Sequence, residues 1–297
     1  MEFITSVNNQ RVKEVANLKQ KKYRTESGAF FAEGLRAVKE AVQYADVTEL
    51  FFTDAEAEQV DAILKTAGHD AVAAKKKDSD RHNAQNQNAG TDKVKNKNGI
   101  RLYQVDGKVM AKLSDTKAPQ GILAVIRTPE QSLRQLRPGT ASDNNAPVII
   151  LDRVQDPGNL GTIIRTADAV GALGIIMLDG CVDAYSPKAV RSSMGSLFHL
   201  PVVQDVTAEE ALTWCYRNGY EPAATALKNA QNVYKADISK KMAFIFGNEA
   251  NGVAEELQAA AETRLFIPMA GLAESMNVAM AAGIVLFEGL RQRRFWR

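Results

Sequence analysis

Short apolar runs recur along the second half of the chain, and stretches with helical spacing separate them. The clearest run is Val148–Leu151, four consecutive apolar residues, which is the pattern of a strand buried on both faces of a parallel sheet. Further runs predict strands at Gly174–Leu178, 201–203, 223–227, Met242–Phe246 and 264–267. Helices are predicted between and after them at 160–170, 189–197, 209–217, 254–261 and 275–293. Repeated strand–helix units of this kind predict a mostly parallel α/β sheet with helices on both faces.

The first part of the chain shows the same alternation over shorter elements. A basic stretch with helical spacing opens it. Two more helices are predicted at Leu35–Tyr44 and 56–67, and strands at 30–34, 50–53, 103–105 and 121–126. These elements indicate a second, smaller α/β domain built of packed layers.

Two polar segments interrupt the pattern. Residues 75–98 almost lack apolar side chains, so they cannot bury enough surface to offset the entropy of ordering them, and we interpret them as a mobile surface insertion. Residues 131–147 are rich in turn-forming types and have the composition of a linker. We therefore divide the chain into an N-terminal domain at 1–130 and a C-terminal domain at 148–297.

Composition narrows the possible functions only slightly. With 297 residues, 45% of them hydrophobic, the chain can form two cores, while a net charge of +2 is too small to establish a nucleic-acid partner. Two unpaired cysteines and three scattered histidines predict neither a disulfide framework nor a metal site. The chain shows no signal peptide and no apolar run that could cross a bilayer, so we expect a cytoplasmic protein without a membrane partner.

Three polar loops with glycines follow predicted strands, at the edge where open parallel sheets bind ligands. The first, 152–161, leads into a helix that carries Asn159 and Arg165, about a turn and a half apart. We expect both side chains to face a common site near the start of the helix. Taken alone, this loop is explained equally well as an ordinary turn followed by a surface arginine.

The other two loops add a backbone feature and further polar side chains. Gly247 follows a strand directly, where its backbone can approach a flat ligand, and Glu249 needs partners for its charge if it is buried. In the third loop, Ser275 is a good N-cap for the final helix, and Asn277 is a poor helix former, which suggests a side-chain role. Local capping explains each feature when it is taken alone.

Together the three loops resemble the motifs of the SpoU (TrmH-type) family of the SPOUT superfamily, the S-adenosylmethionine-dependent RNA 2′-O-ribose methyltransferases. NxGxxxRTAxAxGA matches residues 159–172, GNExxG matches 247–252, and IPMxGxxxSxNVAxA matches 267–281. The N-terminal part resembles, more weakly, the RNA-binding extension of this family through residues 33–36 and 114–122.

The resemblance implies a deep trefoil knot in the C-terminal domain and a homodimer whose active sites lie near the subunit interface. It implies S-adenosyl-L-methionine as cofactor, contacted by Gly247, Ile267 and Met276, largely through their backbones. It also implies a catalytic site made of one arginine and four surrounding polar residues: Arg165, Asn159, Glu249, Ser275 and Asn277.

The resemblance further implies methyl transfer to a ribose hydroxyl. Arginine stays protonated in ordinary protein settings, so we expect Arg165 to stabilise developing alkoxide charge and hold a phosphate rather than act as a base. Basic side chains near both ends of the chain are candidates for binding RNA: Lys19, Lys21, Lys22, Arg24, Arg291, Arg293, Arg294 and Arg297. Because the N-terminal extension looks ribosomal, we favour ribosomal RNA over transfer RNA as substrate.

Two alternatives remain open: a transfer RNA 2′-O-methyltransferase, and a non-catalytic RNA-binding module. A titration with S-adenosylmethionine would separate the second alternative from an enzyme. A nucleotide-dependent α/β enzyme is disfavoured, because neither domain has a GxGxxG after its first strand or a P-loop. The sequence does not identify the target nucleotide.

Overall fold

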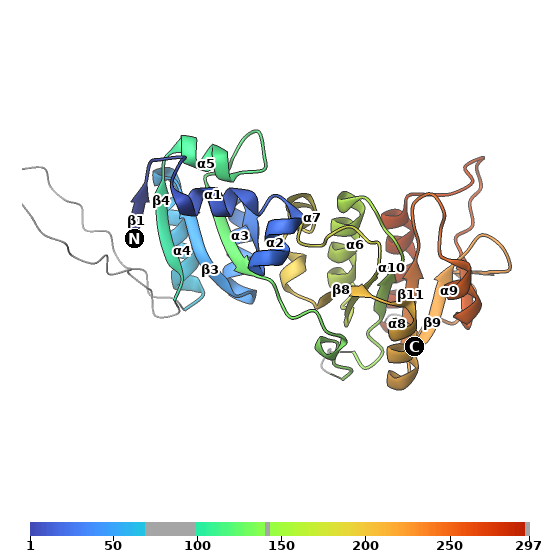
Figure 1. Cartoon of the computed structure of the whole chain (residues 1–297). Helices are drawn as coiled ribbons and strands as arrows, with labels where there is room; N and C mark the ends of the chain where they lie inside the picture. Colours follow the sequence, from blue (N-terminus) through green and yellow to red (C-terminus); the bar gives the residue numbers. More distant parts are fainter. Residues whose placement is uncertain (69–98, 140–142, 295–297) are drawn as a thin grey trace, which may run out of the picture. The chain divides into compact units, whose positions relative to one another are not determined.

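The chain forms two compact units, Met1–Thr128 and Pro129–Arg297, each with its own sheet (Figure 1). The computed structural model describes residues 1–68, 99–139 and 143–294. The predicted insertion at 75–98 therefore lies outside the described residues.

The first unit contains a mixed sheet with the strand order β1-β4-β3-β5-β2. β4 pairs parallel with both its neighbours, whereas β5 runs antiparallel to β3 and β2. The strands are β1 (Glu2–Ile4), β2 (Ala29–Glu33), β3 (Val47–Phe52), β4 (Arg101–Val105) and β5 (Ile122–Arg127). The helices are α1 (Gln10–Asn17), α2 (Lys21–Ser27), α3 (Leu35–Tyr44), α4 (Ala57–Thr66) and α5 (Gly107–Leu113).

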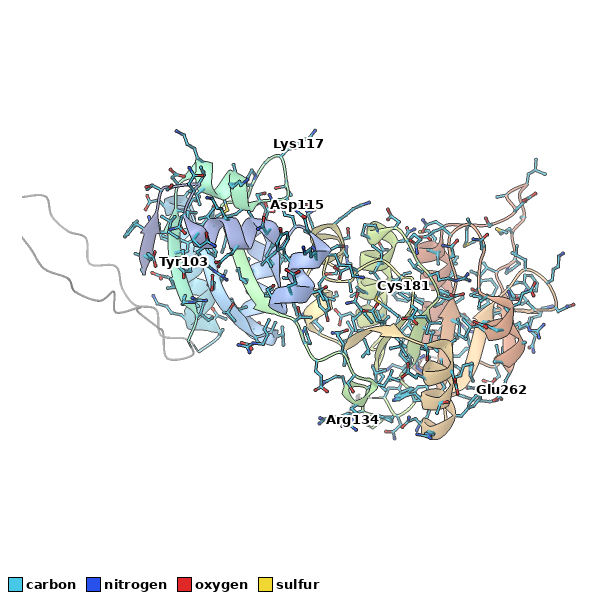
Figure 2. The ribbon with its side chains drawn as sticks, in the orientation of Figure 1. Tyr103, Asp115, Lys117, Arg134, Cys181 and Glu262 are labelled. Carbon is cyan, nitrogen blue, oxygen red and sulfur yellow. The ribbon has the colours of Figure 1, made fainter. Side chains whose placement is uncertain are left out.

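Glu33, at the end of β2, ties down the loop between α5 and β5. Its carboxylate accepts hydrogen bonds from the side chains of Ser114 and Thr116 and from the backbone N–H of Asp115. Figure 2 labels Asp115 and Lys117 on this loop. The two segments that carry the weaker N-terminal resemblance are therefore adjacent in the fold.

The second unit contains a sheet of seven strands, all parallel, in the order β10-β12-β9-β11-β6-β7-β8. The strands are β6 (Val148–Leu151), β7 (Gly174–Leu178), β8 (Val202–Val206), β9 (Glu221–Thr225), β10 (Gln231–Asn232), β11 (Met242–Phe246) and β12 (Thr263–Phe266). The helices are α6 (Pro157–Ala169), α7 (Pro187–Ser192), α8 (Ala208–Asn218), α9 (Glu255–Ala260) and α10 (Val278–Arg294).

Both faces of this parallel sheet are covered, as its continuous apolar strands require. Ile150 and Ile245 belong to one core, together with Cys215 of α8 and Leu257 of α9. On the opposite face, Phe244 lies against Gly289 of α10, and α10 packs on α6, which packs on α7. The predicted parallel α/β arrangement is confirmed.

Three helix boundaries were predicted wrongly. α6 begins at Pro157, three residues before the predicted start at residue 160, because Asp156 caps it. The final helix begins at Val278, and its cap is Asn277 rather than Ser275, because the Asn277 side chain accepts hydrogen bonds from the backbone N–H groups of the next turn. The helix predicted at 189–197 ends at Ser192, since Met194 and Gly195 both adopt positive φ angles, 53° and 99°, which a helix cannot continue through.

Arg24 and Arg293 were predicted wrongly as RNA contacts, because both are buried. Arg24 Nη1 donates to the carbonyl oxygen of Leu18 at 2.7 Å. Arg293 Nε lies 3.0 Å from Asp143 Oδ2, and this ion pair ties the end of α10 to the segment before β6. Arg291 pairs with Glu288 on the same helix, and Arg297 lies outside the described residues.

Within the described ranges, no helix is long and apolar enough to cross a membrane. The same residues bring no three His, Cys, Asp or Glu side chains together as a metal site would need.

Candidate functional site

A cavity of about 550 Å³ lies at the carboxyl edge of the seven-stranded sheet, where the loops after β9, β11 and β12 meet. This volume falls within the range of roughly 300–1,000 Å³ that is common for small-molecule sites. Six residues singled out from the sequence line it: Gly247, Glu249, Ile267, Ser275, Met276 and Asn277. Because β9, β11 and β12 are neighbouring parallel strands, their carboxyl ends bring these loops to one place.

The loop after β11 can take its shape only because residue 247 is glycine. A Cβ at Gly247 would lie 2.0 Å from the carbonyl carbon of Gly252 and 2.1 Å from the backbone nitrogen of Val253. Asn248 and Gly252 exchange two backbone hydrogen bonds, of 3.0 and 2.9 Å, which close the loop. The wall of the cavity is therefore fixed by the backbone itself.

Glu249 holds the loop after β6 against the loop after β11. Its carboxylate accepts hydrogen bonds from the backbone N–H groups of Gln155 and Asp156, each 3.1 Å at the shortest, and from Asn159 Nδ2, at 3.1 Å. Burial opposes ionisation, but these hydrogen bonds outweigh it and hold the pKa of the carboxyl below its ordinary value. Glu249 is therefore a stable anion whose lone pairs are directed at fixed donors.

Asn159 and Asn277 continue this network toward the final helix. Asn277 Nδ2 donates to Asn159 Oδ1 at 2.8 Å, and Asn277 Oδ1 accepts from the backbone N–H of Ala279 at 2.9 Å. Each amide thus uses its oxygen as acceptor and its nitrogen as donor, so both amide orientations are set by their neighbours. Asn159 does not line the cavity but connects two residues that do, Glu249 and Asn277.

Arg165 stands apart from this network. It is exposed on α6 and does not line the cavity, and among the described residues it has neither a hydrogen bond nor an ion pair. Six residues along a helix turn the side chain about 120° away from that of Asn159. The structure therefore brings together Asn159, Glu249 and Asn277, but it does not bring Arg165 of the same chain to them.

One wall of the cavity was not predicted from the sequence. It consists of residues 225–228, at the end of β9 and just after it, and Asn248 and Gln258 also line the cavity. Residues 225–228 could have been predicted only from the order of the strands in the sheet. β9 lies between β11 and β12, although it precedes both in sequence.

Cys181, labelled in Figure 2, lies in the loop after β7. Its Sγ donates to the carbonyl oxygen of Leu151 at 3.2 Å, and burial raises its pKa to about 11. A thiol with so high a pKa is a poor nucleophile at neutral pH, so Cys181 is not a candidate for nucleophilic catalysis.

Two family models match the chain. The model of the SpoU rRNA Methylase family matches residues 146–287, and the model of the MRM3-like substrate binding domain matches residues 9–124.

Similar proteins match over nearly the whole chain. The 23S rRNA (guanosine(2553)-2'-O)-methyltransferase RlmP of Bacillus subtilis (strain 168) is 32% identical over 287 residues, which cover 97% of this chain and 98% of the relative. The AdoMet-bound rRNA methyltransferase from Sinorhizobium meliloti has a TM-score of 0.79 and 31% identity, covering 99% of this chain and 98% of that one. The SpoU methyltransferase AviRb from Streptomyces viridochromogenes in complex with AdoMet has a TM-score of 0.79 and 27% identity, covering 98% and 100%.

Proposed function

The chain belongs to the SpoU rRNA methylase family, and on that basis we propose that it transfers a methyl group from S-adenosylmethionine to a ribose 2′-hydroxyl of ribosomal RNA. The observation that carries this proposal is that two of the three sequence motifs line the same cavity, while the third is hydrogen-bonded to both. We assign RNA binding to residues 1–130, methyl transfer to 148–297 and a linker role to 131–147. A ribosomal RNA substrate agrees with the cytoplasmic location that we expect.

The cavity suits a cofactor of the size and mixed polarity of S-adenosylmethionine. It is lined by apolar residues, by Gly247, and by the polar residues Asn248 and Glu249. Gly247, Ile267 and Met276 line it and would hold the cofactor. When bound, the cofactor supplies an electrophilic methyl group on a positively charged sulfonium.

The residues of the chain supply orientation and charge stabilisation. Glu249 and Asn277 fix the amide of Asn159, which in turn can orient the ribose at the mouth of the cavity. Ser275 lines the cavity two residues before Asn277 and offers a further hydroxyl to the bound molecules. Arg165 stabilises negative charge that develops on the attacking oxygen, and it holds the neighbouring phosphate.

A homodimer accounts for the position of Arg165. Met280 and Phe287 are 63% and 51% exposed, and their spacing of seven places them on one face of α10, which packs on the helix that carries Arg165. A second copy that covers this apolar face would bring an Arg165 to the cavity of its neighbour. A dimer would thus account both for the exposed apolar face and for an arginine that has no partner among the described residues of its own chain.

Phe287→Glu is expected to make the protein monomeric, because a charge in the centre of the proposed interface would have to be desolvated on association. Analytical ultracentrifugation of the purified variant measures this directly. Phe3→Glu is the matched control, since Phe3 is also exposed, at 66%, but lies on β1 of the other unit. If both variants keep the wild-type mass in solution, this face is not the interface.

We also propose the trefoil knot that the family resemblance implies. Its support is the path of the chain after β12, which leaves the sheet two strands from β11, returns through residues 268–277 beside Asn159, and ends in α10 on the face that α6 covers. An experimental trace of residues 247–294 would test the threading.

Glu249→Gln is expected to lower kcat for methyl transfer by about tenfold, because its amide would present hydrogens to donors that need an acceptor. The carboxylate has a pKa below its ordinary value of 4.5, so it stabilises the fold above that pH, and this contribution is lost as the pH falls through the lowered pKa. The Tm of the variant should therefore approach that of the wild type below about pH 4.5.

Glu255→Gln, an exposed carboxylate on α9, is the control for this change. It should alter neither kcat nor the pH dependence of Tm. An unchanged kcat in Glu249→Gln would show that the hydrogen-bonded network does not position Asn159 for the reaction.

The proposed activity is tested by mapping ribose methylation in RNA from cells that lack the gene and in the same RNA after incubation with the enzyme and S-adenosylmethionine. We expect a ribosomal RNA position to lose its methyl group and to regain it. Methylation of transfer RNA alone would instead support the alternative substrate, and failure to bind the cofactor in a calorimetric titration would support a non-catalytic RNA-binding protein.

A further inference from the structure

An ion pair lies beside the proposed active site and has no part in the reaction described above. Lys188 Nζ is 2.9 Å from Asp156 Oδ2, and Asp156 Oδ1 accepts a hydrogen bond of 2.9 Å from the backbone N–H of Asn159. Both side chains lie against the first turn of α6, since a Cβ at Gly158 would be 2.8 Å from Asp156 Oδ1 and 3.6 Å from Lys188 Cε. The ammonium group is therefore held against the turn that carries Asn159.

The place of Lys188 along the sheet edge separates it from the cofactor cavity. The cavity is formed by the loops after β9, β11 and β12, whereas Lys188 follows β7, on the other side of β6. Asn159 follows β6 and so lies between the two. A ribose that reaches Asn159 with its hydroxyl toward the cavity would thus have part of its chain over the ends of β6 and β7, beside Lys188.

Lys188 has donors left for a ligand. An ammonium group carries three hydrogens, and within the part of the chain that the structure describes its one hydrogen-bond partner is Asp156. The side chain is 53% exposed. Lys188 and the Asn159 backbone also keep Asp156 ionised, because their hydrogen bonds lower its pKa. The ammonium is therefore oriented on one side and open to solvent on the other.

We propose that Lys188 binds a phosphate of the RNA backbone next to the nucleotide that is methylated, with Asp156 holding the ammonium in place. The inference rests on the proposed function, because it needs an RNA strand at Asn159. Lys188 is a substrate-positioning residue in this account. An ordinary surface ion pair would give the same geometry without any effect on RNA, so the test must measure RNA binding separately from stability.

The experiment compares Lys188→Met, Lys188→Arg and Lys240→Met in the full-length protein. Lys240 is the matched control, because its side chain is 59% exposed and its Nζ lies 3.5 Å from Glu221. Unlike Lys188, it precedes β11 and so lies at the amino ends of the parallel strands. The measurements are KM and kcat on unmethylated ribosomal RNA at several salt concentrations, the Kd for S-adenosylmethionine, and Tm.

We expect Lys188→Met to raise KM for RNA by about five- to tenfold at low salt and to reduce the slope of log affinity against log salt by about one, as for one lost phosphate contact. The Kd for S-adenosylmethionine and Tm should not change, Lys188→Arg should keep the wild-type slope, and Lys240→Met should resemble the wild type.

An unchanged KM and slope in Lys188→Met, or an equal effect of Lys240→Met, would overturn the inference. A loss of Tm and cofactor affinity together would show that the ion pair is structural. If the wild-type enzyme transfers no methyl group to RNA at all, the proposed function fails, which is a different outcome.

Discussion

Arg165→Ala is expected to reduce methyl transfer to ribosomal RNA at least about 100-fold, the loss typical for removing a group that stabilises charge in a transition state. The Kd for S-adenosylmethionine and Tm should stay near their wild-type values, because Arg165 is exposed and does not line the cavity. A radiolabelled methyl-transfer assay and a calorimetric titration give the two readings. Parallel losses of rate and cofactor affinity would instead assign Arg165 a binding or folding role.

Two further variants make this result specific. Arg165→Lys keeps the positive charge but loses the planar guanidinium that forms two hydrogen bonds to a phosphate. Its methyl-transfer rate should therefore lie between those of Arg165→Ala and the wild type. Arg217→Ala removes an exposed arginine from α8, which lies on the opposite face of the sheet from α6, and should leave the rate unchanged.

Gly247→Ala is expected to weaken S-adenosylmethionine binding by at least about 100-fold, because the close contact of its Cβ with backbone atoms forces the loop to move. The atoms it would meet belong to Gly252 and Val253, within 2.1 Å, so no rotation of a flexible side chain can relieve the clash. Calorimetry measures the affinity for S-adenosylmethionine, and Tm shows whether the substitution also destabilises the fold.

Gly271→Ala is the matched control for this substitution. Gly271 lies in the neighbouring loop after β12, and a Cβ there meets nothing within 4 Å. The control should bind the cofactor as the wild type does. Wild-type affinity in Gly247→Ala would show that the cofactor does not depend on the shape of this loop.

The two variants together test whether Arg165 acts in the neighbouring subunit. A dimer of one Arg165→Ala chain and one Gly247→Ala chain has one intact cavity, in the first chain, and one intact arginine, in the second. If the arginine serves the cavity of its partner, co-expression of the two inactive chains should restore about a quarter of the wild-type rate, since half of the dimers are mixed and each has one working site. If it serves its own chain, the mixture stays inactive.

Local pattern predicted six of the seven strands of the parallel sheet in the second unit and missed the two-residue edge strand β10. Strands covered by helices on both faces need continuous apolar runs such as Val148–Leu151. The residue types therefore predict that these strands are buried. The start of the final helix could not be predicted from local pattern. Ser275 and Asn277 are both good caps, and the choice of Asn277 depends on its hydrogen bond to Asn159, which is far away in sequence.

The motif positions predict candidate site residues, whereas the tertiary structure decides which of them lie close together. Strand order placed β9 between β11 and β12 and so added residues 225–228 to the cavity, a neighbourhood that no local pattern encodes. Folding also turned Glu249 into the acceptor that holds Asn159, and left Arg165 outside the cavity of its own chain. Residue types and spacing limit what chemistry is available, whereas distances between groups far apart in the sequence depend on how the whole chain packs.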